Sequence, residues 1–214
     1  MKAVSIGNES NLVANKDFSL ESNGGYYNTG LHVWGQSQAQ FNGKTNIVVK
    51  NGVNTARAVY IYDNVEGTTK AEFNDDLTIS TAGSSADYLY GFDVRNGGKA
   101  DIAKGLFMND NGAITWSLFA SGADSKIDVN STGSGEVQVI GDVGGYNGGV
   151  VNMNMNTDTS YLTAASYITG NGEVNFDISN SAVWNMTGSS RATDLNINNG
   201  IVDLRADKNR YSTL

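Results

Sequence analysis

The sequence predicts an all-β protein, a parallel β-helix that forms a single domain over residues 1–214. Three observations predict this fold class. Apolar and polar residues alternate with a period of two in many short segments, which is typical of strands with one buried face. Turn-forming pairs such as Asn51-Gly52 and Asn147-Gly148 separate these segments, since both residue types tolerate the positive φ of tight corners. Related segments also recur at intervals of about 20–30 residues, as expected for a strand-only solenoid.

The expected strands follow one another along the whole chain. They lie at 31–34, 59–62, 73–79, 137–139, 151–155, 174–178 and 195–197. In the clearest of them every second residue is apolar, for example Val174, Phe176 and Ile178. No amphipathic stretch with the helical period extends beyond about two turns, so the segments between strands are corners, including one at Asn111-Gly112. The 27 asparagines suit such corners and can also stack into amide ladders between neighbouring coils.

Internal copies favour a solenoid over other β folds. Residues 39–47 (AQFNGKTNI) resemble residues 71–79 (AEFNDDLTI), and shorter copies lie at 99–102 (KADI) and 125–129 (SKIDV). Each copy follows an aromatic-rich segment, at 31–34, 59–62, 89–92 and 116–119. A propeller would need blades of about 40–45 residues with a recurring signature, which the sequence lacks. A β-sandwich remains the alternative. Coils of about 25 residues would give a parallel β-helix of eight or nine coils.

Composition excludes several classes of function. The chain has no cysteine and a single histidine, His32, so it cannot form a disulfide framework or a zinc finger. Its 14 basic and 22 acidic residues give a net charge of −8, which argues against a nucleic-acid partner because phosphate contacts need clustered lysine and arginine. The sequence has no apolar run long enough for a transmembrane helix and no signal peptide. We therefore expect either an intracellular protein or a mature fragment.

The C-terminal part carries a more specific pattern. Residues 180–190 (NSAVWNMTGSS), 194–204 (DLNINNGIVDL) and 210–214 (RYSTL) resemble the last coils of the pertactin-like passenger of a type V autotransporter. This resemblance implies a right-handed, single-stranded parallel β-helix of the pectin-lyase-like kind. It also implies export through the outer membrane to the bacterial cell surface or the medium. The chain would then be a fragment of a longer passenger, with membrane contact only through a C-terminal β-barrel beyond Leu214.

The resemblance implies a non-enzymatic stem that acts in adhesion or display. The expected partner is a host-cell surface glycan or protein, or another copy of the chain, and no cofactor is expected. The alternative is a carbohydrate-active β-helix enzyme, a polysaccharide hydrolase or lyase. Such an enzyme needs paired carboxylates, and Asp75 and Asp76 are the nearest candidates. Adjacent strand residues point to opposite faces, so we expect a corner turn there and assign no catalytic, metal or cofactor-binding residue.

The aromatic segments offer the candidate ligand contacts. If Val59 and Ile61 face the core, Tyr60 and Tyr62 face outward. Stacked coils would then place Trp34, Tyr62 and Tyr90 in one exposed column. A file of aromatic rings can bind sugar faces or a protein partner, although rings that cover the coil faces are the plainer reading. We therefore take Trp34, Tyr60, Tyr62 and Tyr90 as candidate contacts, and His32 as a surface or ladder histidine.

Overall fold

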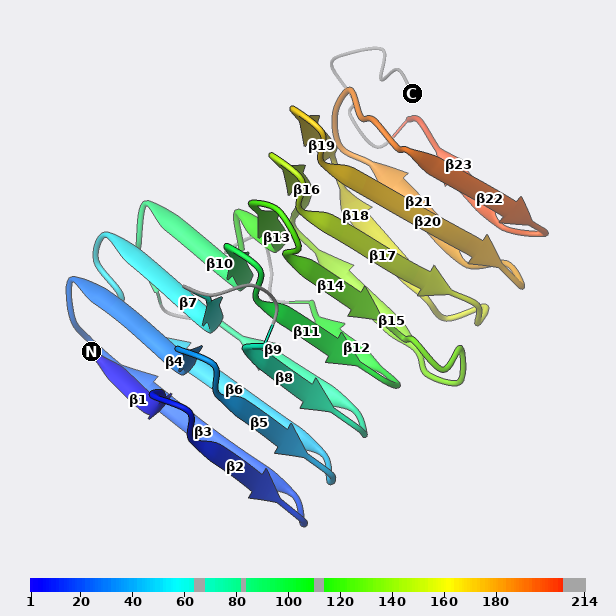
Figure 1. Cartoon of the computed structure of the whole chain (residues 1–214). Helices are drawn as coiled ribbons and strands as arrows, with labels where there is room; N and C mark the ends of the chain where they lie inside the picture. Colours follow the sequence, from blue (N-terminus) through cyan, green and yellow to red (C-terminus); the bar gives the residue numbers. More distant parts are fainter. Residues whose placement is uncertain (64–67, 82–83, 110–113, 206–214) are drawn as a thin grey trace.

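The computed structural model describes residues 1–63, 68–81, 84–109 and 114–205. Within them the chain is all β and winds through three parallel sheets, one strand to each sheet in turn, so that every strand stacks on its equivalent in the next coil. This arrangement confirms the expected single-stranded parallel β-helix (Figure 1). The described residues form no helix of the length and apolar character that crossing a membrane requires. The corner expected at Asn111-Gly112 and the segment 210–214 lie outside the described residues.

We name the sheets A, B and C in the order in which the chain passes through them. Sheet A holds β1 (Lys2–Ile6), β4 (Tyr27–Trp34), β7 (Thr55–Tyr62), β10 (Tyr88–Arg95), β13 (Trp116–Ser121), β16 (Asp142–Tyr146) and β19 (Ser166–Thr169). Sheet B holds β2 (Asn11–Ala14), β5 (Gln38–Phe41), β8 (Lys70–Phe73), β11 (Lys99–Ile102), β14 (Lys126–Val129), β17 (Val150–Met155), β20 (Glu173–Ser179) and β22 (Asp194–Asn198). Sheet C holds β3 (Phe18–Asn23), β6 (Thr45–Lys50), β9 (Leu77–Ser80), β12 (Leu106–Met108), β15 (Val137–Ile140), β18 (Tyr161–Ala164), β21 (Val183–Met186) and β23 (Ile201–Asp203).

The coils shorten towards the C-terminus. Side chains that hydrogen-bond across neighbouring coils are 27 and 32 residues apart near the N-terminus, then 24, 23 and finally 19 residues apart. The described part of the chain makes seven coils with a strand in each sheet, followed by a last coil that consists of β22 and β23 alone. The expected eight or nine coils thus become seven and a partial eighth, because the early coils are longer than the expected average.

The internal copies coincide with sheet B. Ala39, Ala71 and Ala100 lie in register on β5, β8 and β11. Two residues further on, Phe41, Phe73, Ile102 and Val129 form the next inward column. The Phe41 and Phe73 rings stack with their centroids 5.0 Å apart and their planes at 6°. The repeat seen in the sequence is therefore the coil itself, confirmed in register across four strands.

The core is one continuous apolar column enclosed by the three sheets. Alternating residues fill it as the period of two predicts, and Val151, Met153 and Met155 of β17 are all buried. Trp184 is the largest fully buried side chain, and its Nε1 donates to the carbonyl oxygen of Ala164 at 3.1 Å. Several corners are made by left-handed asparagines, as expected, among them Asn51 and Asn147 at φ 53° and 50°.

Candidate binding face

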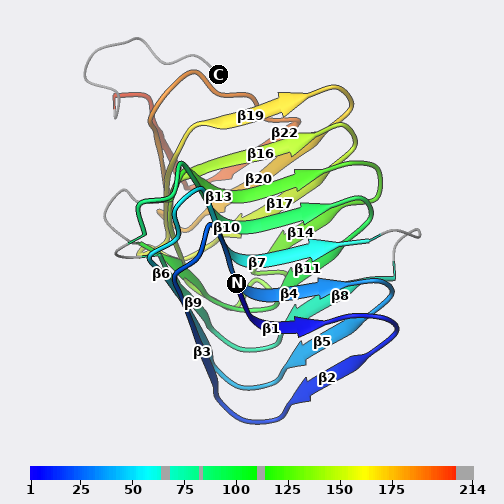
Figure 2. The ribbon, with the colours of Figure 1, turned by 90° about the vertical axis from the view of Figure 1, so that its left-hand side faces the viewer.

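The outer face of sheet A carries most of the aromatic side chains singled out by the sequence. We call it the aromatic face and define it by Trp34, Tyr60, Tyr62, Tyr90, Trp116, Phe119, Tyr146 and Tyr167. Figure 2 shows the strands that bear these residues stacked one above another along the rod. Val59 and Ile61 are fully buried, so Tyr60 and Tyr62 face outward as expected. The face therefore spans the coils from β4 to β19.

Two of the candidate residues align as expected. Trp34 and Tyr62 are in register on β4 and β7, and both are half-buried. The indole of Trp34 also extends over the first coil, where a Cβ on Gly7 would collide with it. Tyr60 lies opposite His32. Trp34, Tyr60 and Tyr62 therefore form one partly solvent-exposed group across neighbouring coils.

The expected position of Tyr90 is wrong. Tyr90 is in register with Arg57 and Trp116, and the residue opposite Tyr62 is Arg95. Tyr90 is also 8% exposed, so it is largely covered. The error arises because Gly91 and Phe92 both face the core. A Cβ on Gly91 would meet the sulfur of Met108 inside the coil, and Phe92 is fully buried. Two successive inward positions interrupt the period of two, so the true counterpart of segment 59–62 is 92–95.

The rings contact one another along the face. The imidazole of His32 stacks on Tyr60, with centroids 5.0 Å apart and planes at 8°, and on Trp34 at 6.2 Å and 14°. Further along, Trp116 and Phe119 lie 5.3 Å apart. These two rings contact three further members of the face at centroid distances between 5.0 and 5.8 Å: Tyr90, Tyr146 and Tyr167. Stacked contacts at His32 and edge-to-face or tilted contacts around Trp116 and Phe119 order the rings of this surface.

His32 is a neutral group within this surface. It is 7% exposed, and its Nδ1 lies 3.4 Å from Oγ of Ser5. Burial lowers the pKa of His32 to about 4, and the positive charges of Lys2 and Arg57 contribute in the same direction. The expectation of a ladder histidine agrees with this position, since His32 and Tyr60 occupy equivalent places in successive coils.

A cluster of charges that we did not predict lies at the centre of the face. The side chain of Asp93 is fully buried and binds two arginines: Nε of Arg57 lies 2.5 Å from one carboxylate oxygen, and Nε of Arg95 lies 2.6 Å from the other. Burial lowers the pKa of Arg95, but its hydrogen bond with Asp93 and the charge of that carboxylate outweigh it, and the net pKa is raised. The guanidinium groups of Arg57 and Arg95 thus bring positive charge to a surface that is otherwise mainly aromatic.

The aromatic face ends in a pocket of about 420 Å³ near the C-terminal coil. Tyr146 and Tyr167 line one part of it, and Ser189, Ser190 and Arg191 line another. Next to these tyrosines, burial raises the pKa of Asp142, although the backbone N–H of Ala165 opposes the shift by donating to it. A single carboxyl group of raised pKa does not make the carboxylate pair that glycoside hydrolysis needs.

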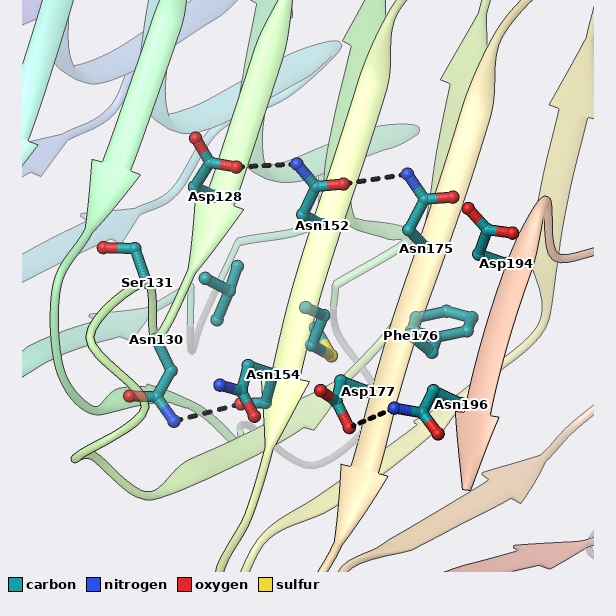
Figure 3. A pocket seen from close by; sticks show the side chains of 12 residues that line it. Asp128, Asn130, Ser131, Asn152, Asn154, Asn175, Phe176, Asp177, Asp194 and Asn196 are labelled. Atoms are coloured by element: carbon teal, nitrogen blue, oxygen red, sulfur yellow. Dashed lines mark hydrogen bonds between the residues drawn. The ribbon is translucent and has the colours of Figure 1, made fainter. Parts of the chain in front are cut away.

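A second concave surface lies on the outside of sheet B. This groove, which we call the amide groove, has a volume of about 380 Å³ and is lined mainly by asparagine and aspartate (Figure 3). In Figure 3 the amide of Asn152 donates to Asp128 at 2.7 Å and that of Asn175 donates to Asn152 at 2.9 Å. These bonds confirm the expected amide ladder between coils. Most of the polar atoms that form the ladder are thus already engaged with one another.

The acidic pair lies at a corner, as expected, and this corner divides the segment expected as one strand at 73–79 between β8 and β9. Asp75 and Asp76 fall between β8 and β9, where Asp75 binds Nζ of Lys104 at 3.2 Å and Asp76 binds Nζ of Lys44 at 3.3 Å. The hydrogen bond from Lys104 lowers the pKa of Asp75, followed by that from the backbone of Asp76. A general acid needs a raised pKa, so this environment does not favour acid catalysis. In the parts of the chain that the structure describes, no group of three or more His, Asp or Glu side chains could hold a metal ion.

The residues that we missed are Arg57, Asp93 and Arg95. Arg57 lies 36 residues before Asp93 and meets it only because β7 and β10 are in register, whereas Arg95 lies two residues beyond Asp93 on the same strand. They could have been found by using the sheet B repeat to align the strands of sheet A that precede each copy.

Comparisons with known proteins find no match: no protein family, curated protein sequence or solved structure resembles this chain closely enough to be significant.

Proposed function

We propose that this chain is a non-enzymatic stem segment of a pertactin-like autotransporter passenger, and that its aromatic face mediates adhesion. In this role it is carried on the bacterial cell surface or secreted after export through the outer membrane, and it binds a host-cell surface glycan or protein. The observation that carries the proposal is the aromatic face itself. Ordered, partly exposed rings that recur from coil to coil along a rod favour a role in recognition, because large exposed apolar patches mark interaction sites in many proteins.

The fold and the C-terminal pattern support the autotransporter assignment. The segment 180–190, on which the resemblance rests, contributes Trp184 and Met186 to the core of β21, where both are fully buried. The tryptophan and methionine of that pattern therefore have a packing role that a β-helix requires. A cysteine-free chain also suits export in an unfolded state.

The residue types of the aromatic face suit the expected partners. Arginine, tyrosine and tryptophan are the residues that dominate binding energy at recognition surfaces, and here they lie side by side. Sugar rings bind aromatic faces through their apolar C–H surfaces, and protein partners bind them by burying apolar area. A second copy of the chain is the remaining expected partner.

The first prediction tests this surface directly. Trp34→Ala and Tyr62→Ala should each lower binding of the purified chain to host cells or glycans at least tenfold, because each removes a ring from the exposed group. Since both rings are half-buried, the free energy of unfolding should fall by about 1–2 kcal/mol, within the usual range for single substitutions. Binding is measured on cells and on a glycan array, and stability by denaturant unfolding.

Tyr161→Ala is the matched control. Tyr161 is also a half-buried tyrosine, but it lies on β18 of sheet C, so its loss should leave binding unchanged. Full binding by both Trp34→Ala and Tyr62→Ala would remove the adhesive role of the face. Cleavage of a polysaccharide that is abolished by replacing Asp75 and Asp76 with alanine would instead establish the enzyme alternative.

A further inference from the structure

We propose that the centre of the aromatic face is a site for an acidic saccharide, one that carries a carboxylate or sulfate group, and that Arg57 and Arg95 bind this group. The inference rests on the proposed function and names the ligand class of the same face. Asp93 and the two arginines form a cluster with an excess positive charge, unused hydrogen-bond donors and aromatic rings around it.

The cluster of Asp93 and the two arginines carries an excess positive charge. One buried carboxylate, that of Asp93, is shared by two guanidinium groups, so the cluster keeps one net positive charge. The side chain of Arg57 is only 19% exposed and that of Arg95 36% exposed. An excess charge that is partly removed from water is costly unless an opposite charge compensates it. The chain as a whole has a net charge of −8, so this cluster is a local positive site on an acidic protein. Such a site favours an anionic ligand.

Both arginines keep hydrogen-bond donors that Asp93 does not use. Each arginine uses Nε for Asp93. The residues that the structure describes provide no hydrogen-bond acceptor for the terminal nitrogens of either side chain. A guanidinium group has five N–H donors in a planar fork, and that fork matches carboxylate and sulfate oxygens. Asp93 thus positions the arginines through one edge and leaves their remaining donors for a ligand.

Aromatic rings surround both guanidinium groups. Cζ of Arg57 lies 4.6 Å from the ring centre of Tyr60 and 5.6 Å from that of Tyr90, and Cζ of Arg95 lies 5.2 Å from that of Phe119. These rings hold the guanidinium groups in place by cation–π contact. Tyr60, Tyr62 and Phe119 are half-buried, so part of each ring reaches solvent. A sugar whose anionic group reaches the arginines could therefore place its C–H face on a neighbouring ring.

The phenol groups of the site are neutral at physiological pH. Burial raises the pKa of both Tyr60 and Tyr90, and the charge of Asp93 raises it further, against the opposing effect of the arginines. Their hydroxyl groups can therefore donate hydrogen bonds to a saccharide as well as accept them. The site thus combines a cationic pair, aromatic platforms and hydroxyl donors, which an acidic sugar satisfies better than a neutral one.

The test compares acidic and neutral saccharides on the unmodified chain. The probes are a sulfated oligosaccharide, a uronic-acid oligosaccharide and a neutral oligosaccharide of equal length, and binding is measured by calorimetry at low, physiological and high salt. We expect at least tenfold tighter binding of one acidic probe than of the neutral probe, and a loss of that preference at high salt because added ions screen the attraction. Equal affinity for acidic and neutral probes would overturn the inference.

Variants then locate the site. Arg95→Gln should lower acidic-saccharide affinity at least tenfold, and Arg95→Lys should lower it less because it keeps the charge but loses the fork. Arg205→Gln is the matched control, since Arg205 is an exposed arginine that is also paired with an aspartate, Asp203. Unchanged acidic binding in a folded Arg95→Gln chain would overturn the assignment. If only neutral probes bind, and Trp34→Ala abolishes that binding, the adhesive function stands and this inference fails; if neither cells nor any saccharide binds, both fail.

Discussion

His32 shows how one residue can couple this surface to acidity. Its imidazole lies between the rings of Trp34 and Tyr60, and burial is the main reason that its pKa falls to about 4. A protonated imidazole would be partly desolvated there and would face the charges of Lys2 and Arg57. The folded state therefore keeps His32 neutral under conditions in which an unfolded chain would already protonate it.

This difference predicts an acid-sensitive contribution to stability. The unfolded chain takes up a proton near pH 6.5, whereas the folded chain does so only near pH 4. The stability that depends on neutral His32 is thus fully present above about pH 6.5 and is lost as the pH falls towards 4, by about 1–3 kcal/mol in total. His32→Phe keeps a stacked ring without a titratable group, so its unfolding free energy should fall less between pH 7 and about pH 4.5.

The measurement is denaturant unfolding of both chains at each pH, which cancels the common contribution of the carboxyl groups. Because His32 is the only histidine, its NMR titration gives the pKa without assignment. A titration midpoint near 6.5, together with equal acid sensitivity of the two chains, would contradict the buried, neutral imidazole.

At the scale of strands, the ladder on sheet B contains an unsatisfied junction. Four side chains lie in register on β14, β17, β20 and β22: Asp128, Asn152, Asn175 and Asp194. They form three junctions, but only the two amides can donate, and each donates across one junction. Asn152 donates to Asp128 and Asn175 donates to Asn152. The Oδ1 atom of Asn175, on the side of Asp194, is consequently buried without a partner.

Asp194→Asn should therefore stabilise the protein. The new amide supplies the missing donor to Oδ1 of Asn175, and satisfying a buried acceptor contributes about 1 kcal/mol. Asp128→Asn is the matched control at the other end of the ladder. It weakens the acceptor used by Asn152 and removes the ion pair with Lys126 at 3.0 Å, so it should give no gain. Denaturant unfolding of the three chains measures the difference, and a loss of stability in Asp194→Asn would refute this account of the junction.

A comparison of sheets A and B explains which features the sequence could predict. On sheet B the pattern Lys-Ala-acid-apolar returns at Lys70, Lys99 and, with Ile in place of Ala, at Lys126, so the repeat and the register follow from residue types alone. On sheet A the segments between strands differ in length, and both Gly91 and Phe92 turn towards the core. Alignment by aromatic content then slips by three residues. This slip leaves the alignment of Trp34 with Tyr62 correct. It misplaces Tyr90 and hides the pairing of Arg57 with Asp93.

Considered as a whole, the molecule is a quasi-one-dimensional stack in which each coil contacts only its neighbours. The free energy needed to open each coil locally should therefore follow the apolar surface that the coil buries. The column of Phe92, Leu118 and Val143 on sheet A continues with Ser166, whose hydroxyl donates to the carbonyl oxygen of Arg191 at 2.6 Å. Beyond it, the last coil has strands only in sheets B and C, at the red end of the rod in Figure 1. Apolar burial thus decreases towards β22 and β23.

The last prediction is that amide protection decreases in the same order. Ile197, Ile201 and Leu204 remain 47%, 50% and 45% exposed, and Leu195 and Val202 are only partly buried against the core, so opening β22 and β23 exposes less additional apolar surface than opening a strand whose inward residues are fully buried. Opening β17 would instead expose Val151, Met153 and Met155, which are all at most 2% exposed. Native-state hydrogen exchange reports these local opening free energies. Amides of 194–203 should exchange at least a hundredfold faster than those of 150–155, and Met153→Ala should accelerate exchange in β14, β17 and β20 more than in β5. Uniform protection along the rod would mean that the coils open as one cooperative unit and that local burial does not set their stability.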